Sequence, residues 1–346
     1  MFLVLSFSLY NHLYMKRVLT GDRPTGVLHL GHFVGSLSSR LEMQDTYEVF
    51  ILIADVQALT DNFDNPSKIR NSILEIMKDY LSIGLDPSKC KFILQSEVPE
   101  IAELTIFFSN LVTISRLMRN PTVKSEIIDK KGSFTNKNIT YGFLGYPVSQ
   151  AADITIFEAD VVPVGIDQSP MVEQTVELVK KFNLIYKNTL KIPKVILTDT
   201  PMLVGIDGKS KMSKSLGNTI NLSEEENMLK KKVFSMYTDP TRIHKDDPGH
   251  VEGNPVFIYH RLFNDNIDEV RDLEDRYKKG TVGDVEVKEK LFIALNNFIT
   301  PIREKRLLLK DENYLLDILS EGTKYSRAIA RDTIVKVKDA MALYSI

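Results

Sequence analysis

Two histidines flank a glycine near the start of the chain, directly after a turn rich in glycine and proline. The turn is Gly21-Asp22-Arg23-Pro24-Thr25-Gly26, and His29-Leu30-Gly31-His32 follows at the start of a predicted helix. Backbone N–H groups and the positive dipole end make a helix N-terminus attractive to anions. Gly31 would let a ligand approach the backbone, and both imidazoles can donate hydrogen bonds to phosphate oxygens. The pattern predicts a phosphate-binding turn, although a helix N-terminus with incidental histidines fits the tetrapeptide equally well.

A cluster of lysines and serines forms the second segment that could do chemistry. Gly208-Lys209-Ser210-Lys211-Met212-Ser213-Lys214-Ser215 contains three of each. Charge clusters usually form solvated surface loops. A mobile loop of small residues and point charges is also suited to gathering the leaving group of a triphosphate, so both interpretations stay open for this segment alone.

A third segment places polar side chains on an otherwise apolar helix. The sequence predicts a helix over residues 147–157, with Gln150 and Asp153 on one face and Tyr146 at its start. A carboxylate among alanines and isoleucines needs a partner, either an Arg or Lys of the core or the N–H group of a ligand. The stretch Asp160-Val161-Val162-Pro163-Val164-Gly165-Ile166-Asp167-Gln168 follows directly.

Taken together, the first two segments resemble the HIGH and KMSKS motifs of the class I aminoacyl-tRNA synthetases. Residues 211–215 match the second motif at all five positions, and residues 29–32 match the first with one conservative change. Tyr146, Gln150 and Asp153 resemble the amino-acid site of both the tyrosyl and the tryptophanyl branches. The turn at 21–26 and the stretch at 160–168 are similar to the tryptophanyl branch, and the resemblance extends over nearly the whole chain from Met15.

The resemblance implies activation of L-tryptophan by ATP, release of pyrophosphate and transfer of tryptophan to the 3′ end of tRNA(Trp). The substrate carboxylate would be the nucleophile, so catalysis would consist of positioning and charge stabilisation. The residues expected to act on the phosphates are His29, His32, Lys211 and Lys214, with Lys209 beside them. The residues expected to contact ATP are Arg23, Pro24, Thr25, Gly31, His32, Gly165, Ile166, Asp167, Met202, Lys211, Met212, Ser213, Lys214 and Ser215. Tryptophan would contact Tyr146, Gln150, Asp153 and Gln168, with Asp153 accepting the indole N–H.

The resemblance also implies partners and leaves alternatives. Mg²⁺ would be bound mainly by the ATP phosphates, with no metal site built by the protein, and a homodimer is expected.

The chain departs from the pattern of the tryptophanyl branch at two positions. Many bacterial tryptophanyl enzymes have Asn at the position of His32, and Ile166 replaces a frequent acidic residue, which leaves only backbone contacts there. A tyrosyl-tRNA synthetase remains the alternative within this class, because a phenol would suit the same residues. A non-catalytic synthetase paralogue is the alternative outside it.

The order of apolar runs predicts the scaffold that would position these residues. Short apolar runs near residues 18–19, 49–54, 91–94, 161–164 and 195–197 alternate with helical patterns, which indicates an α/β fold with a Rossmann-like, doubly wound parallel sheet. Strand signals almost vanish after Leu222, and helices are predicted over 284–300 and 325–343. We therefore expect a catalytic domain over 15–222 and an all-helical tRNA (anticodon)-binding domain over 223–346.

Composition adds bounds on partners and location. The net charge of the 346-residue chain is −2, so an RNA site must be a local patch. The candidates are Lys230-Lys231-Lys232 and the helix face bearing Arg327, Arg331 and Lys338, which fit a solvated surface equally well. One cysteine suits a reducing cytosol, and no run approaches 18 apolar residues, so no membrane contact is expected. Residues 1–14 have charges only after their apolar run, unlike a secretory signal, and are interpreted as an extension or a start-site artefact.

Overall fold

The computed structural model of the chain describes residues 15–129, 139–198, 202–244 and 246–344. The predicted N-terminal extension, residues 1–14, lies outside these ranges. Within them no helix is long and apolar enough to cross a membrane.

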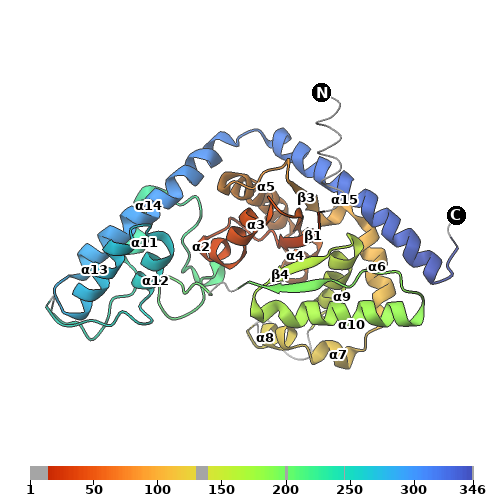
Figure 1. Cartoon of the computed structure of the whole chain (residues 1–346), viewed down its shortest axis with the longest axis horizontal. Helices are drawn as coiled ribbons and strands as arrows, with labels where there is room; N and C mark the ends of the chain where they lie inside the picture. Colours follow the sequence, from red (N-terminus) through yellow and green to blue (C-terminus); the bar gives the residue numbers. More distant parts are fainter. Residues whose placement is uncertain (1–14, 130–138, 199–201, 245, 345–346) are drawn as a thin grey trace.

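A five-stranded parallel sheet forms the centre of the larger unit, which confirms the predicted fold class (Figure 1). The strand order is β3-β2-β1-β4-β5, so the chain winds outward in both directions from β1. The strands are β1 (Arg17–Asp22), β2 (Glu48–Ile53), β3 (Cys90–Leu94), β4 (Val161–Val164) and β5 (Lys194–Leu197). Every residue of β2 is buried, because helices cover both faces of the sheet at this strand.

Helices of the sheet unit fill the connections between these strands. They are α2 (Leu30–His32), a π-helical turn (Phe33–Leu37), α3 (Ser38–Met43), α4 (Asp55–Asn62), α5 (Pro66–Ile83), α6 (Pro99–Ser109), α7 (Ile114–Met118), α8 (Pro121–Asp129), α9 (Tyr141–Ile156) and α10 (Ser169–Ile185). One core cluster joins β2 and β3 to α5, and the other joins the opposite face of the sheet to α6, α9 and α10. The predicted helix at 147–157 begins two turns earlier, at Tyr141, because the Thr140 hydroxyl caps it by accepting from Phe143 N.

The remaining helices extend to one side of the sheet unit and then return to it (Figure 1). They are α11 (Glu226–Phe234), α12 (Pro255–Phe263), α13 (Ile267–Lys278), α14 (Asp284–Leu308) and α15 (Glu312–Ala340). Both long helices differ from their predicted ranges of 284–300 and 325–343, because α14 ends later, at 308, and α15 starts earlier, at 312, and ends at 340. Helix α14 continues through Pro301, and α15 starts at Glu312, where the Asp311 carboxylate accepts from two backbone N–H groups.

The last helix packs on the sheet rather than on the other C-terminal helices. Its Gly322 lies so close to β3 that a Cβ there would overlap the Phe92 carbonyl, and Thr323 Oγ1 accepts from Leu94 N at 3.0 Å. Helix α15 therefore covers the β3 edge of the sheet. The domain boundary at 222 stays a prediction, but residues 312–340 pack with the sheet unit, so the segment 223–346 is not one packed body.

The same packing bears on one prediction about RNA contacts. Arg327 and Arg331 point to Glu100 of α6, at 3.1 and 3.3 Å, and Lys338 pairs with Glu103 at 2.6 Å. The periodic basic face of α15 is therefore paired with α6 through ion pairs. An RNA contact of this face stays a prediction, and its charges are already partly compensated.

Candidate active site

The carboxyl edge of the sheet gathers most of the predicted site residues. Asp22 is paired with Ile53, and Ile53 with Leu94, so the turn after β1, the start of α4 and Gln95 are neighbours at this edge. The pairing of Val18 with Val161 brings Gly165 to the level of Asp22 when the register is continued. Ligands of doubly wound sheets bind at this edge, beside the strand where the winding reverses, which here is β1.

The end of β1 is fixed by a buried charged group that sequence analysis missed. Asp22 Oδ2 accepts from Arg40 Nη1 and from the Tyr80 hydroxyl, both at 2.6 Å. Arg40 outweighs the effect of burial and lowers the pKa of Asp22 to about 2. Asp22 also acts electrostatically on His32, so the ionised Asp22–Arg40 pair lies beside the histidine segment. The signal was an arginine adjoining the apolar helix face formed by Leu37 and Leu41.

His29 and His32 are neutral imidazoles whose ring centroids are 3.8 Å apart. Burial, with the two nearby lysines of the loop, lowers the pKa of His29 to about 2 and that of His32 to about 4. His29 N donates to His32 Nδ1 at 3.1 Å, which requires the proton of His32 to be on Nε2. His32 can therefore donate from Nε2, while positive charge must come from the lysines.

The lysine loop is docked on the histidine segment. Met212 is buried, and its Sδ lies 3.3 Å from Gly31 N. Leu30 N donates to Ile220 O at 2.9 Å, and Leu222 N to Leu28 O at 3.0 Å, so the chain after the loop pairs with the histidine turn. A Cβ on Gly31 would meet both the His29 ring and Met212 at 3.0–3.3 Å. The small residue is thus needed for this docking, whereas the sequence suggested direct approach of a ligand.

Lys214 reaches across to the opposite motif. Its Nζ donates to Gly26 O at 2.8 Å, and burial lowers its pKa to about 8. Lys211 is exposed and also acts electrostatically on both histidines. Lys209 and Ser215 are exposed, and Ser213 N is held by Asn218 Oδ1 at 2.7 Å. The structure therefore brings Lys211 and Lys214 together with His29 and His32.

The remaining residues predicted for ATP differ in their exposure and in their partners. Ile166 is 80% exposed at the start of a short 3-10 turn, so its side chain is not held by the protein. Asp167 O accepts from Thr122 Oγ1 at 3.0 Å, and its carboxylate accepts from Gln168 Nε2 at 3.1 Å. Arg23 pairs with Asp61 of α4 at 2.8 Å. Pro24 is buried, Thr25 is half-buried and Met202 is 64% exposed.

Asp153 is the buried carboxylate of the third segment, and its surroundings decide between the two partners expected for it. The residue is 3% exposed, and its hydrogen-bond partner among the described residues is Gln95, whose Nε2 donates to Oδ1 at 2.8 Å. Burial raises the pKa of Asp153 to about 7, and Asp55 adds to the effect. No Arg or Lys of the described chain pairs with it, so the expected core ion pair is absent there and a ligand donor fits better.

The other residues predicted for the amino acid adjoin this carboxylate along α9 and at the edge of β4. Tyr146 is buried about two turns before Asp153 on the same face of the helix. Burial, together with the Glu126 carboxylate, raises the pKa of Tyr146. Gln150 is half-buried on the same helix, one turn from both. Gln168 is half-buried at the end of the turn after β4.

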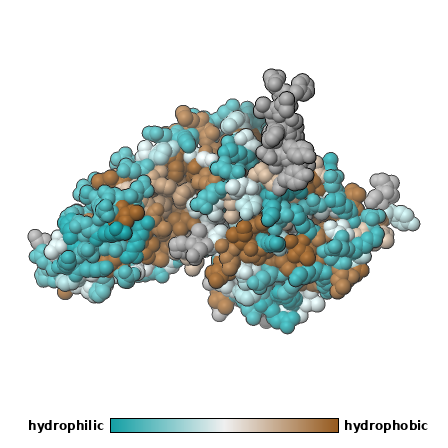
Figure 2. All heavy atoms as spheres, in the orientation of Figure 1, coloured by the Kyte–Doolittle hydropathy of each residue, from teal (hydrophilic) through white to brown (hydrophobic). Residues whose placement is uncertain are grey.

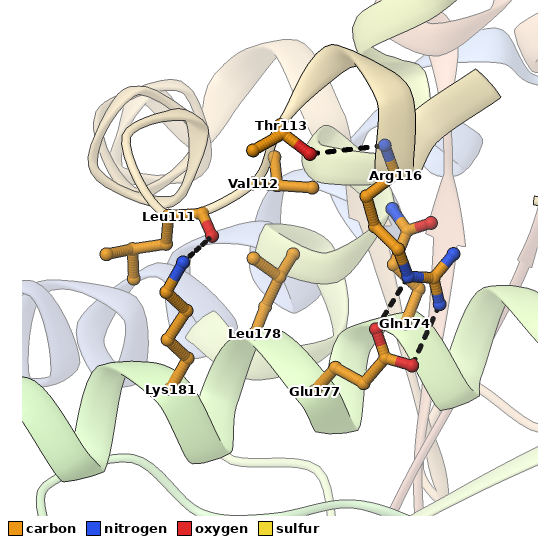
Figure 3. A pocket seen from close by; sticks show the side chains of 8 residues that line it. All are labelled: Leu111, Val112, Thr113, Arg116, Gln174, Glu177, Leu178 and Lys181. Atoms are coloured by element: carbon orange, nitrogen blue, oxygen red, sulfur yellow. Dashed lines mark hydrogen bonds and ion pairs between the residues drawn. The ribbon is translucent and has the colours of Figure 1, made fainter. Parts of the chain in front are cut away.

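A hollow elsewhere in the sheet unit has its charged groups paired internally (Figure 3). It lies between the segment from Leu111 to Arg116 and helix α10. Arg116 binds both oxygens of Glu177 at 2.8 Å, and Lys181 Nζ donates to Leu111 O at 2.7 Å. These contacts fix α7 on α10 and leave this hollow without the convergent free donors that a phosphate site needs.

Comparisons with known proteins agree with this geometry. The family model "tRNA synthetases class I (W and Y)" matches residues 15–300. The tryptophan–tRNA ligase of Borreliella burgdorferi is 50% identical over 336 residues, which are 95% of each chain. That of Clostridium longisporum is 50% identical over 332 residues, covering 94% of this chain and 96% of the relative. A crystal structure of the tryptophanyl-tRNA synthetase from Campylobacter jejuni, complexed with ADP and tryptophan, superposes with a TM-score of 0.82 at 32% identity, covering 94% of this chain and all of that one.

Proposed function

The chain belongs to the class I tRNA synthetases (W and Y), and we propose that its site performs both steps of tryptophan–tRNA ligation. The ligase activity follows from the near-full-length similarity to enzymes of that name, and the roles of individual residues are assigned from geometry. The observation that carries the assignment is Asp153, a buried carboxylate with one oxygen held by Gln95 and no cationic partner in the described chain. Such a group fits the N–H of an indole.

In the first step, a carboxylate oxygen of tryptophan bonds to the α-phosphorus of ATP. The bond from that phosphorus to the bridging oxygen breaks, and pyrophosphate leaves with the electron pair. In the second step, a ribose hydroxyl at the 3′ end of tRNA(Trp) attacks the activated carbonyl, and the bond from the carbonyl carbon to the phosphate oxygen breaks. AMP leaves with that electron pair, and the hydroxyl proton passes to AMP or to water. No protein nucleophile takes part, so the protein supplies position and charge.

The proposed roles follow from what each residue can donate. His32 donates Nε2–H to the phosphates, with His29 beside it, and Lys211 and Lys214 neutralise the charge that develops on the leaving pyrophosphate. Lys209, Ser213 and Ser215 lie on the same loop and would close over the phosphates with Met212 as its apolar anchor.

The adenosine of ATP would lie at the carboxyl edge, between the turns after β1 and β4. We assign its contacts to the backbone of Gly165 and Ile166 and to Asp167, with Arg23, Pro24, Thr25 and Met202 along the rim. The described residues contain no group of three His, Cys, Asp or Glu side chains that could hold a metal. Asp22 is occupied by Arg40 and Tyr80. We propose that Mg²⁺ arrives with ATP as part of the substrate, because this ion is usually held largely by substrate phosphates in nucleotide sites.

Tryptophan would lie over α9, with its ring toward Asp153. Tyr146, Gln150 and Gln168 then remain for its ammonium group, as acceptors or orienting donors.

Aminoacylation of tRNA tests the whole proposal: with ATP and labelled tryptophan, the purified protein should aminoacylate tRNA(Trp). A protein that bound tryptophan and tRNA without forming the ester would be the non-catalytic paralogue. The reaction and the single buried cysteine fit a cytosolic protein, the location that we propose.

Contact with tRNA should involve α11. Lys231 is exposed there, and Lys230 lies over the Phe292 ring at 5.5 Å, whereas Lys232 is paired with Glu224 at 2.6 Å. Replacing Lys230 and Lys231 together by alanine should weaken tRNA binding and lower the slope of its salt dependence by about 1–2. Arg327→Ala, whose side chain is paired with Glu100, is the matched control and should leave the slope unchanged. Equal slopes for all variants would remove α11 from the interface.

We also propose a homodimer, supported by exposed apolar side chains on the sheet unit. Figure 2 shows hydrophobic surface gathered on this unit, while the helical unit is largely hydrophilic. Ile106, Ile114 and Leu184 of α6, α7 and α10 are exposed. Light scattering should give twice the chain mass of 39.4 kDa. Ile114→Asp should shift the protein toward the monomer if α7 lies in the contact, and a monomeric wild type would contradict the proposal.

A further inference from the structure

We propose that Gln95 is a positioning residue for amino-acid selection, whose fixed side-chain amide turns the Asp153 carboxylate so that one oxygen faces the N–H donor of the substrate. This rests on the proposed function, in which Asp153 reads the indole. The roles assigned so far leave Gln95 unused, although it is 2% exposed and directly bonded to Asp153.

Three elements meet at this amide. Gln95 is the first residue after β3, its Nε2 donates to Asp153 Oδ1 of α9 at 2.8 Å, and its Oε1 accepts from Gln57 N in the first turn of α4 at 3.0 Å. The contact with Gln57 fixes the direction of the amide, because a backbone N–H can only donate and so requires the oxygen on its side. The NH₂ group is thereby forced toward Asp153, and rotation of the amide would break both bonds.

The consequence for Asp153 is an asymmetric carboxylate. Oδ1 is occupied by Gln95, while Oδ2 accepts no hydrogen bond from the described residues and is not one of their fully enclosed, unpartnered polar atoms. This oxygen therefore stays open to a ligand, and an N–H that the ligand supplies would complete the hydrogen bonding of the carboxylate. Gln95 thus determines both which oxygen is free and where it points.

Gln95 also favours the ionised form that an N–H donor needs. Burial, with a smaller contribution from the Asp55 carboxylate, raises the pKa of Asp153 to about 7, although the hydrogen bond from Gln95 acts to lower it. Asp55 is itself fixed, because its Oδ1 accepts from Ser96 N at 2.9 Å. Without the amide, the pKa would rise and the carboxyl would be protonated over more of the neutral range.

The test uses Gln95→Met, which keeps the length of the side chain but removes both hydrogen bonds, and Gln95→Glu, which keeps the acceptor for Gln57 but places a second carboxyl group against Asp153. In ATP–pyrophosphate exchange, both should lower kcat/KM for tryptophan at pH 7 by about tenfold or more, mainly through KM, with KM for ATP unchanged. The acidic limb of the tryptophan profile should move to higher pH by about one unit in Gln95→Met, and further in Gln95→Glu because adjacent carboxyl groups raise each other's pKa.

A substrate isostere separates positioning from a general structural effect. β-(Benzothienyl)alanine has sulfur in place of the indole N–H, so its poorer kcat/KM should change little in either variant, and the preference for tryptophan should shrink. Gln44→Met is the matched control: Gln44 also bridges two backbone groups, Gly84 O and Asp86 N, but lies away from the site, and its exchange should equal that of the wild type.

The inference is overturned if folded Gln95→Met and Gln95→Glu keep the wild-type pH profile and the wild-type ratio of tryptophan to its isostere. If a thermal melt shows that one of the two variants is not folded, the pH profile and the substrate ratio of the other variant decide the question. Failure of the proposed function would look different, because the wild-type protein would then show no tryptophan-dependent exchange or no preference for tryptophan over the isostere.

Discussion

Alanine in place of Lys214 lowers the rate of tryptophanyl-adenylate formation by about 10²–10³, the effect expected when a preorganised charge-stabilising donor is lost. Its ammonium group is already held against Gly26 O at 2.8 Å, at the point where the two motifs meet. Because the charge is needed for the developing pyrophosphate rather than for tryptophan, KM for tryptophan should barely move. Single-turnover adenylation measures this directly.

The pH dependence gives the same prediction a second check. Burial lowers the pKa of Lys214 to about 8, so the free enzyme carries this positive charge below pH 8 and loses it as the pH rises through that value. Wild-type kcat/KM for ATP should fall on this alkaline side, and Lys214→Arg, which stays charged, should flatten the limb. Lys89→Ala, at an exposed ion pair with Asp45, is the control. If Lys214→Ala formed the adenylate at nearly the wild-type rate, the account would be contradicted, and the lysine loop would be only a surface turn without a role in catalysis.

Removal of the Asp153 carboxylate should produce the second large effect. Asp153→Ala and Asp153→Asn should reduce kcat/KM for tryptophan at least ~100-fold, about 2.7 kcal/mol, with ATP binding little affected. The physical reason is that an acceptor-only carboxylate rejects ligands lacking a donor by far more than hydrophobic fit can. The preference for tryptophan over phenylalanine should therefore shrink in both variants.

Titration of Asp153 supplies an internal control. Its pKa of about 7 means that the acceptor is lost as the pH falls through neutrality, so kcat/KM for tryptophan should decline on the acid side in the wild type. Asn at this position should abolish that limb. The buried charge is also costly to the fold, so Asp153→Asn should melt no lower than the wild type at pH 8. Retained activity and discrimination in Asp153→Ala would make the residue structural.

The sequence predicts those parts of the molecule that local patterns determine. Continuous apolar runs such as Val49–Ala54 identify buried parallel strands, and the two motifs mark the turns at their carboxyl ends. The charge state of His29 and His32 could not be predicted, because it depends on burial and on lysines some 180 residues away in sequence.

Long-range packing explains the other differences. Arg327 and Arg331 form a periodic basic face in the sequence, but only the return of α15 to the sheet shows that Glu100 faces them. Gln95 is one polar residue at a strand end, and its role depends on α9 approaching from another part of the chain. Periodicity reports which residues share a face and says nothing of what packs against it.

ATP–pyrophosphate exchange with separate amino acids tests the central claim most directly. The wild-type protein, with ATP, Mg²⁺ and labelled pyrophosphate, should exchange label into ATP when tryptophan is added and remain near background with tyrosine or phenylalanine. That result is expected because the indole N–H completes the buried Asp153 carboxylate, phenylalanine has no donor for it, and the near-full-length relatives are tryptophan–tRNA ligases. Exchange driven by tyrosine, or no exchange with any amino acid, would contradict the account.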